Sequence, residues 1–220
     1  MSDLQRRAER MMSNHGFLGV PVGTFEQAGR EQLLDLLAAG LCPESRVVEI
    51  GCGCLRIAYW LIRFLEPGCY CGIEPARVRV EYGLRYLFTP EEITSKRPRF
   101  DHNATFDTSV FGTRFDYFIA RSIWTHASKP QIEASLDAFS RDASETGMLL
   151  ASYLPARNTR EDYLGDSWVG TSHESNVPGV IRHRLSWIKE QCDRRSLHVE
   201  EMDGTDCDSQ YWLHLRKRAR

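Results

Sequence analysis

The 220-residue sequence has no uninterrupted apolar run of about 18 residues, the length that a membrane-spanning helix needs. It also lacks the apolar stretch of a secretory signal near its start, because residues 1–14 are highly charged. The formal net charge is only −2, so nothing indicates bulk attraction to nucleic acid or to a membrane surface. We therefore expect a cytoplasmic protein that binds neither nucleic acid nor membrane.

Internal repeats and low-complexity segments are also missing, and 42% of the residues are hydrophobic. A chain of this length can bury one substantial core, so we expect a single domain, residues 1–220. The seven cysteines are an odd number, which favours reduced thiols. Cys52 and Cys54 lie in a predicted turn, whereas Cys69 and Cys71 lie at the start and in the middle of the next predicted strand. The two pairs should be roughly 15 Å apart, so one metal ion could not easily bind all four thiols. We therefore expect no metal site.

Residues 47–56 are the most informative part of the chain. A short apolar run there contains Glu49 and leads into a Gly51-x-Gly53 turn, which is followed by a second apolar run. The two glycines permit positive φ and let a ligand approach the main chain closely. A further apolar run ends in Glu74, 25 residues after Glu49. That spacing fits one β-α-β unit, whose second strand ends in a carboxylate able to accept hydrogen bonds from a ribose.

Strand-like and helix-like segments alternate along the whole chain. Thr24 is a plausible N-cap for the first predicted helix, and Gly40 lies near the end of that helix. The predicted helices cover residues 24–41, 55–65, 78–88, 131–143 and 180–195. Further strands are predicted at 99–103, 115–120, 147–154, 197–202 and 210–215. Helical crossovers should make five strands parallel, and hairpin chemistry at 203–206 should make the last pair antiparallel.

The polar stretch at 155–178 is too long for an ordinary connection within a compact domain. Segments of this kind often form lids or binding loops. We therefore expect an active-site loop there.

Glu49, Gly51, Gly53 and Glu74, with the Phe115-Asp116 strand entry and the terminal hairpin, resemble a class I S-adenosylmethionine-dependent methyltransferase. The resemblance covers residue 24 to the C-terminus. It implies an α/β, Rossmann-like fold with a seven-stranded, mostly parallel sheet, helices on both faces and an antiparallel C-terminal hairpin. The glycine turn would then carry the amino-acid end of S-adenosyl-L-methionine, while Glu74 would hold the ribose.

One position departs from the common family pattern, because many members have a third glycine where this chain has Leu55. The pattern Gly-Cys-Gly-x-Leu-Arg nevertheless also resembles a subgroup of small bacterial methyltransferases. Arg56 could pair with the carboxylate of the cofactor, or it could be a surface arginine at the start of a helix.

The resemblance places the adenine near the loop at 103–107. Asn103 could hydrogen-bond the base and Phe106 could pack on it, although Asn103 is equally well explained as an ordinary turn residue. Residues 121–126 directly follow the predicted strand at 115–120. They should therefore lie at the carboxyl ends of the strands, where ligands bind in open α/β sheets. The full set of residues expected to bind the cofactor is Glu49, Gly51, Cys52, Gly53, Leu55, Arg56, Glu74, Pro75, Asn103, Phe106, Arg121 and Ser122.

Methyl transfer from a sulfonium is an in-line displacement that alignment of the two substrates can accelerate without a catalytic side chain. A base helps where the acceptor is a hydroxyl or a protonated amine. The candidate bases are His126 and His173. For His126 the alternative is a helix-capping or packed histidine. Glu174 could orient the adjacent His173, but the side chains of adjacent residues often point apart. The aromatic residues expected in an acceptor pocket are Phe17, Trp124, Tyr153 and Trp168. Residues 1–23 are expected to cap the site.

The favoured reading is a methyltransferase for a small-molecule acceptor, in specialised metabolism, because no appended domain for a macromolecular substrate is evident. Methylation of a peptide or protein side chain is the alternative within the same fold. Two other classes stay open: a nicotinamide-dependent oxidoreductase and a cofactor-binding subunit without catalysis. A homodimer is the oligomer considered.

Overall fold

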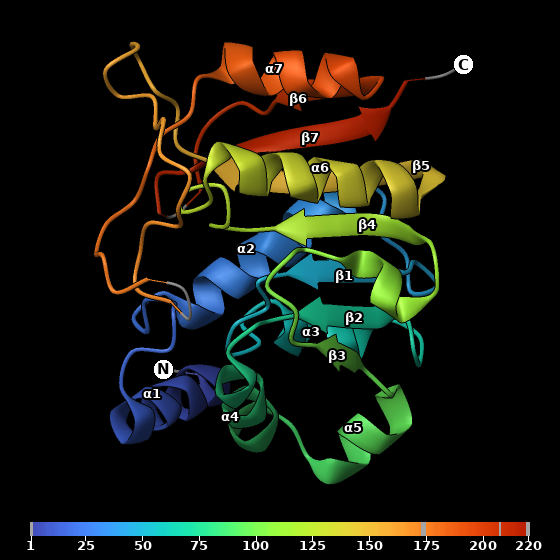
Figure 1. Ribbon diagram of the computed structural model, residues 1–220. Coiled ribbons are helices and arrows are strands. Elements are labelled where there is room, and N and C mark those ends of the chain that lie inside the picture. The colour runs from blue at the N-terminus through green and yellow to red at the C-terminus, as the bar shows by residue number, and fades with distance from the viewer. Residues whose placement is uncertain (1, 173–174, 207, 219–220) are drawn as a thin grey trace. The chain divides into compact units, whose positions relative to one another are not determined.

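The computed structural model describes residues 2–172, 175–206 and 208–218. The chain forms two compact units, residues 1–102 and residues 103–220 (Figure 1). No described helix is long and apolar enough to cross a bilayer.

The strand order is β3-β2-β1-β4-β5-β7-β6, and helices flank the sheet. Within the first unit β1 pairs with β2, and β2 pairs with β3, both in parallel. Within the second unit β4 and β5 are parallel, whereas β7 is antiparallel to both β5 and β6. The predicted fold class, a seven-stranded and mostly parallel sheet with an antiparallel C-terminal hairpin, is confirmed.

The first unit alternates helices and short buried strands. Its elements are α1 (Asp3–His15), α2 (Phe25–Ala38), β1 (Val47–Ile50), α3 (Ala58–Phe64), β2 (Tyr70–Ile73), α4 (Arg77–Leu87), α5 (Pro90–Lys96) and β3 (Arg99–Asp101). Every residue of β1 and β2 is buried, as expected for parallel strands covered on both faces. Thr24 occupies the N-cap position of α2, but its side chain makes no capping hydrogen bond.

Helix α2 ends close to Gly40, as the sequence predicted. Gly40 has φ +96, and its N–H donates to the Leu37 carbonyl. The next N–H, that of Leu41, reaches back to the carbonyl of Leu36. Both hydrogen bonds belong to the Schellman motif, in which glycine adopts the left-handed conformation without steric cost.

Two helices of the first unit were not predicted. Helix α1 buries Leu4, Ala8 and Met11, whose spacing of four and three residues is the ordinary signal of an amphipathic helix. Helix α5 begins with a capping box in which Thr89 and Glu92 exchange hydrogen bonds, with Pro90 in the first turn. Both signals are present in the sequence, but the high charge of residues 1–14 and the breaker Thr89-Pro90 obscured them.

Helix α3 begins at Ala58, three residues later than predicted. Leu55 has φ +67, which lies in the left-handed region and is incompatible with a right-handed helix. The turn therefore extends through Leu55 before the helix can start.

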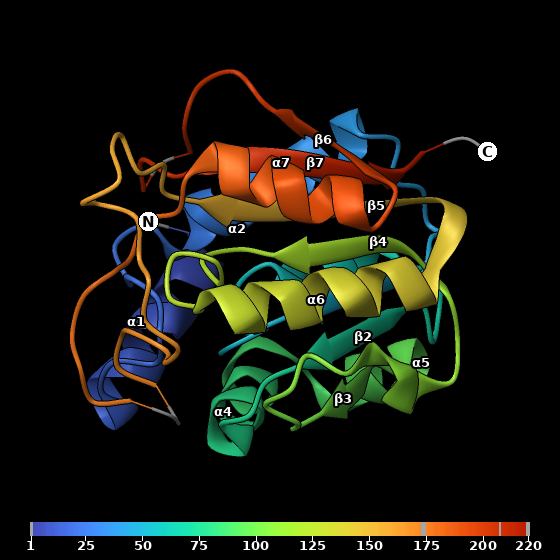
Figure 2. The same cartoon turned by 45° about the horizontal axis from the view of Figure 1, so that its top comes forward.

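The second unit contains the longer strands. Its elements are the 3₁₀ helix η1 (Thr108–Phe111), β4 (Phe115–Ala120), α6 (Lys129–Asp142), β5 (Ala143–Tyr153), α7 (Leu185–Arg194), β6 (Leu197–Glu201) and β7 (Tyr211–Lys217). Helices α6 and α7 lie on the same side of strands β4, β5 and β7 (Figure 2). Helix α6 starts as predicted, near Pro130, with a capping box between Ser128 and Gln131.

Helix α7 starts at Leu185, five residues later than the prediction of a helix at 180–195. The preceding residues are held extended instead. The Ile181 N–H donates to the Thr125 carbonyl, and the His183 N–H donates to the Leu154 carbonyl. These long-range bonds hold Ile181 and His183 against distant residues, so tertiary structure overrides the local preference. The segment that connects β5 to α7 therefore runs from 154 to 184.

Candidate functional site

The turn after β1 has an unusual backbone. Positive φ angles occur at alternate residues, at Gly51 (+72), Gly53 (+52) and Leu55 (+67). The turn is tied to the next strand, because the N–H groups of Gly51 and Cys52 both donate to the Ile73 carbonyl, at 2.8 and 3.0 Å. A Cβ built on Gly53 would meet nothing nearer than the Gly51 carbonyl oxygen, at 3.9 Å. The backbone at Gly53 is therefore open to a ligand within this unit.

Glu74 follows β2 and lies directly against this turn. Its buried carboxylate accepts hydrogen bonds from the Gly53 N–H at 3.1 Å and from the Ala76 N–H at 3.0 Å. Arg79 of α4 lies 3.7 Å from the same carboxylate. A carboxylate can accept about four hydrogen bonds, so two N–H donors leave it capacity for ligand hydroxyls. The two acids singled out in the sequence therefore flank one glycine turn, as predicted.

Glu49, the acid within β1, is buried next to Tyr70 of β2. Its carboxyl group accepts a hydrogen bond from the Tyr70 hydroxyl at 2.5 Å. Burial raises the pKa of Glu49 to about 8, against the opposing effects of Tyr70 and of the Arg56 charge. Burial and the charge of Glu49 also raise the pKa of the Cys52 thiol, which is therefore protonated at neutral pH. Tyr70 belongs to this buried cluster although nothing in the sequence signals it, and contact of Glu49 and Cys52 with a cofactor stays a prediction.

Arg56 is buried and lies close enough to lower the pKa of Glu49. The alternative of an exposed surface arginine is therefore wrong. Pro75 leads into α4, where its carbonyl accepts a hydrogen bond from the Arg77 N–H.

Asn103 organises the loop that follows β3. Its side-chain oxygen accepts hydrogen bonds from the N–H groups of Thr105 and Asp107, while its amide donates to the Asp107 carbonyl. Phe106 is buried and has φ +58. The turn-forming role of Asn103 is therefore present, and contact of Asn103 and Phe106 with an adenine stays a prediction.

Arg121 and Ser122, which follow β4, are bound into a network with the β6–β7 connection. The buried guanidinium of Arg121 pairs with Asp206 at 2.6 Å and with Asp208 at 2.5 Å. The hydroxyl of Ser122 accepts from the Gln210 amide, and the Ser152 hydroxyl accepts from the Ser122 N–H and donates to Gln210. These contacts give both predicted cofactor residues structural partners, and their contact with a cofactor stays a prediction.

His126 is bound to the long segment that connects β5 to α7. Its Nδ1 lies 2.7 Å from the Val169 carbonyl, and the Val169 N–H donates to the His126 carbonyl at 3.0 Å. The imidazole also stacks on Trp168, with ring centroids 5.5 Å apart. Burial lowers the pKa of His126, while hydrogen bonds to the backbone of Val169 and Gly179 oppose that effect. A neutral ring near pH 7 then donates from Nδ1 to the carbonyl.

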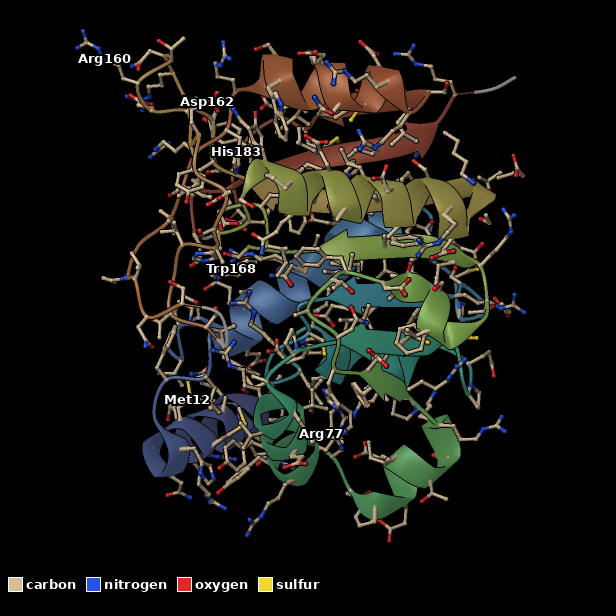
Figure 3. The ribbon with its side chains drawn as sticks, viewed as in Figure 1. Met12, Arg77, Arg160, Asp162, Trp168 and His183 are labelled. Atoms are coloured by element: carbon tan, nitrogen blue, oxygen red, sulfur yellow. The ribbon has the colours of Figure 1, made fainter. Side chains whose placement is uncertain are left out.

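The same segment carries a buried polar cluster that the sequence did not reveal. Asp162 accepts hydrogen bonds from Lys129 at 2.8 Å and from the Arg184 side chain at 3.0 Å. His183 is fully buried, and its Nε2 contacts the Ala127 carbonyl. Arg160, Asp162, Trp168 and His183 all come from the 154–184 segment, and Arg160 lies farther out than the other three (Figure 3). These contacts fasten the segment near the start of α6 at Asp162 and again at His183, close to its C-terminal end.

The predicted acceptor-pocket residues have different surroundings. Phe17 is 65% exposed, as a surface pocket residue can be. Trp124 is fully buried, and its indole N–H donates to Ser135 on α6, which makes it a core residue. Tyr153 is also buried, and its hydroxyl donates to Glu201 on β6. We therefore correct the expectation for Trp124 and Tyr153, because neither side chain is presented to a ligand. His173 lies outside the described residues, so its role stays a prediction.

Helix α4 adds two residues that sequence reasoning missed. Arg79 pairs with Glu74, and Gly83 lies against Cys54 and Leu55 of the turn. An isolated glycine inside a helical pattern often has a packing reason, so Gly83 was the available signal. Among the described residues, no group of three or more His, Cys, Asp or Glu side chains could hold a metal ion.

No protein-family model matches the chain. Solved structures do match in fold. The magnesium protoporphyrin IX methyltransferase ChlM of Synechocystis PCC 6803, with bound SAM, has a TM-score of 0.64 and 15% identity, covering 99% of this chain and 92% of that chain. DesVI of Streptomyces venezuelae has a TM-score of 0.65 and 11% identity, covering 99% and 100% of the two chains. A DhpI-SAM-HEP complex has a TM-score of 0.64 and 12% identity, covering 97% and 94%. This chain therefore has a Rossmann-like methyltransferase fold.

Proposed function

We propose that the chain is an S-adenosylmethionine-dependent methyltransferase that acts on a small-molecule acceptor. The observation that carries the proposal is the pairing of Glu74 with the Gly53 N–H, which joins a buried carboxylate to an open glycine turn. The fold supports it, since ChlM and DhpI are described with SAM bound. When bound, S-adenosylmethionine supplies an electrophilic methyl group on a positively charged sulfur.

In this proposal Glu74 accepts hydrogen bonds from the ribose hydroxyls, and the turn at 51–55 holds the amino-acid end. Arg56 neutralises the carboxylate of that end, which a buried guanidinium can do strongly. Asn103 and Phe106 contact the adenine, while Pro75, Arg121 and Ser122 complete the surroundings. The methyl acceptor then needs alignment and exclusion of water more than it needs a catalytic group.

A base is needed only where the acceptor carries a proton that must leave. His126 and His173 stay the candidates for that base. Because Nδ1 of His126 already contacts a carbonyl oxygen, a base role for this residue would use its other nitrogen.

A specific observation supports the peptide or protein acceptor as the second candidate. Three apolar side chains of the 154–184 segment are exposed: Leu164 (77%), Val177 (57%) and Val180 (54%). Exposed apolar groups in a binding segment are typical of contact with a larger partner. We keep the small molecule first, because scattered exposed residues are also normal on a protein surface.

The deciding experiment is a calorimetric titration of the purified chain with S-adenosylmethionine, with its demethylated product and with NAD. We expect the first two to bind and NAD not to bind. Binding of NAD alone would instead support the oxidoreductase. Transfer of a labelled methyl group to a panel of small molecules and peptides then separates the two acceptor classes, and cofactor binding without transfer to any acceptor would support a non-catalytic subunit.

Replacement of Glu74 tests the ribose assignment. Glu74→Ala should weaken S-adenosylmethionine binding by about 1.5–3 kcal/mol, the range for hydrogen bonds to a charged group. Glu74→Gln is the matched variant, because it keeps one acceptor oxygen for the Gly53 N–H, and its loss should be smaller. Equal affinity of Glu74→Ala and the unmodified chain in calorimetry would remove Glu74 from the site.

A further inference from the structure

One face of α4 is pressed against the glycine turn. Arg79 and Gly83 are four residues apart and therefore lie on the same side of this helix. Arg79 reaches Glu74, and its charge also opposes the effect of burial, which raises the pKa of the Cys54 thiol to about 12. Gly83, one turn further along, reaches the turn itself. Two contacts on one helical face thus hold the turn from the same direction.

The contact at Gly83 leaves no room for a side chain. A Cβ at this position would lie 2.7 Å from the Cys54 carbonyl oxygen and 2.7 Å from Leu55 Cγ. Both distances are well inside van der Waals contact, and one of the two atoms belongs to the backbone and cannot rotate away. Glycine in the middle of a helix lowers helix stability by roughly 0.5–1 kcal/mol relative to alanine. The close approach of α4 to the turn gives this glycine a physical reason.

Leu55 is the second partner in this contact. It is fully buried, with 0% of its surface exposed, and it has φ +67, a conformation that leucine adopts rarely. If a left-handed backbone were the only requirement here, glycine would satisfy it at lower cost. The leucine side chain must therefore make a contact that glycine cannot make. That contact is its packing against α4 at Gly83.

We propose that Leu55 and Gly83 are positioning residues for the cofactor, in that their contact holds the 51–55 turn in one conformation. This inference rests on the proposed function of the turn. The leucine side chain fills the space that Gly83 leaves, so the backbone of residues 51–55 keeps its conformation in the absence of a ligand. A turn fixed in advance loses less conformational entropy on binding, which favours affinity.

Two single substitutions test the contact from its two sides. Leu55→Gly removes the side chain while allowing the same backbone angle, and Gly83→Ala inserts a Cβ where the Cys54 carbonyl lies. We expect each to weaken S-adenosylmethionine binding about tenfold or more, measured by calorimetry well below the melting temperature of the variant. Glu81→Ala is the matched control, because Glu81 is exposed on the same helix, and the affinity of this variant should not change.

A double variant tests whether the two residues act through one shared contact, and hydrogen exchange tests the conformation of the turn without a ligand. Because Leu55 Cγ is one of the atoms that a Cβ at position 83 would strike, Leu55→Gly with Gly83→Ala should lose less affinity than the two single losses combined. Amide hydrogen exchange at Cys52 and Gly53 should be faster in both single variants without any ligand present. That measurement applies even to a variant that binds too weakly for calorimetry.

The outcomes separate the inference from the proposed function. If the unmodified chain fails to bind S-adenosylmethionine, the proposed function is wrong, while hydrogen exchange still reports whether the contact holds the turn. If the unmodified chain binds but Leu55→Gly binds equally well or more tightly, glycine is simply the better residue and the inference is overturned. Equal exchange rates in all variants would overturn it as well.

Discussion

At the scale of single residues, the fold changes the ionisation of Glu49. Its carboxyl group is hydrogen-bonded to Tyr70, and burial raises its pKa from 4.5 to about 8. At neutral pH the folded protein therefore keeps a proton on this group, whereas the unfolded chain does not. A neutral carboxyl costs less to bury than a carboxylate, which is the physical reason for the shift.

The raised pKa makes stability depend on pH. Between pH 4.5 and about 8 the folded state holds one more proton than the unfolded state at Glu49, so stability falls as pH rises through this window. The loss approaches about 1.4 kcal/mol per pH unit for a single proton. Above pH 8 both states are ionised, and the contribution becomes constant.

Glu49→Gln should remove this dependence. In denaturant unfolding at a series of pH values from 5 to 8.5, we expect the variant to gain stability relative to the unmodified chain as pH rises. Glu81→Gln, at an exposed position on α4, is the control and should leave the pH profile unchanged. Parallel profiles for Glu49→Gln and the unmodified chain would show that Glu49 does not carry a raised pKa.

At the scale of elements, the 154–184 segment is the long connection whose position the tertiary structure determines. Its middle and its C-terminal part are bound to residues 125 and 126: the Val169 N–H donates to the His126 carbonyl, and the Ile181 N–H donates to the Thr125 carbonyl. Gly170 fits because it has no side chain, since a Cβ there would lie 2.4 Å from His126 Nδ1. His126 thus fastens this segment by its backbone and by its ring.

Substitution of His126 separates the ring stack from the hydrogen bond. His126→Phe keeps an aromatic ring against Trp168 but removes the donor to the Val169 carbonyl. Amide exchange of Val169, Gly170 and Ile181 should become faster by up to about tenfold, since such a hydrogen bond contributes about 0.5–1.5 kcal/mol. His126→Asn places an N–H donor near the position of Nδ1 and should restore slow exchange. His198→Phe, at an exposed site on β6, is the control.

Exchange rates unaltered by His126→Phe would show that the ring does not fasten the segment. His126 would then be left with its predicted role as a base. Measurement of transfer rates, once an acceptor is known, tests that role independently of the segment.

At the scale of the whole molecule, a ligand that binds only the folded chain stabilises it by mass action. We expect S-adenosylmethionine at about one hundred times its dissociation constant to stabilise the fold by about 2.7 kcal/mol. Thermal unfolding should therefore shift upward with S-adenosylmethionine and should not shift with NAD. Glu74→Ala at the same ligand concentration should show a smaller shift. An equal shift with NAD would contradict the proposed cofactor.

The sequence by itself determined the order and type of most elements. The pattern of apolar and polar residues predicted the strands at 115–120, 197–202 and 210–215 within two residues, because a strand leaves a period of two in its sequence. The glycine turn and the two acids were also readable, since their spacing along the chain reflects one β-α-β unit.

Only the tertiary structure determined the left-handed backbone conformation of Leu55, the burial of Arg56 and the hydrogen-bond partners of His126. Each depends on residues distant in the sequence: α4 reaches Leu55 through Gly83, and the 154–184 segment returns to His126 at Val169. The late start of α7 has the same cause, because Ile181 and His183 are bound to carbonyl groups of the β4–α6 connection and of Leu154. Local patterns record which face of an element is buried, but they do not record what that face meets. The turn, first recognised by its glycines, therefore depends for its shape on a leucine and on a glycine in another helix.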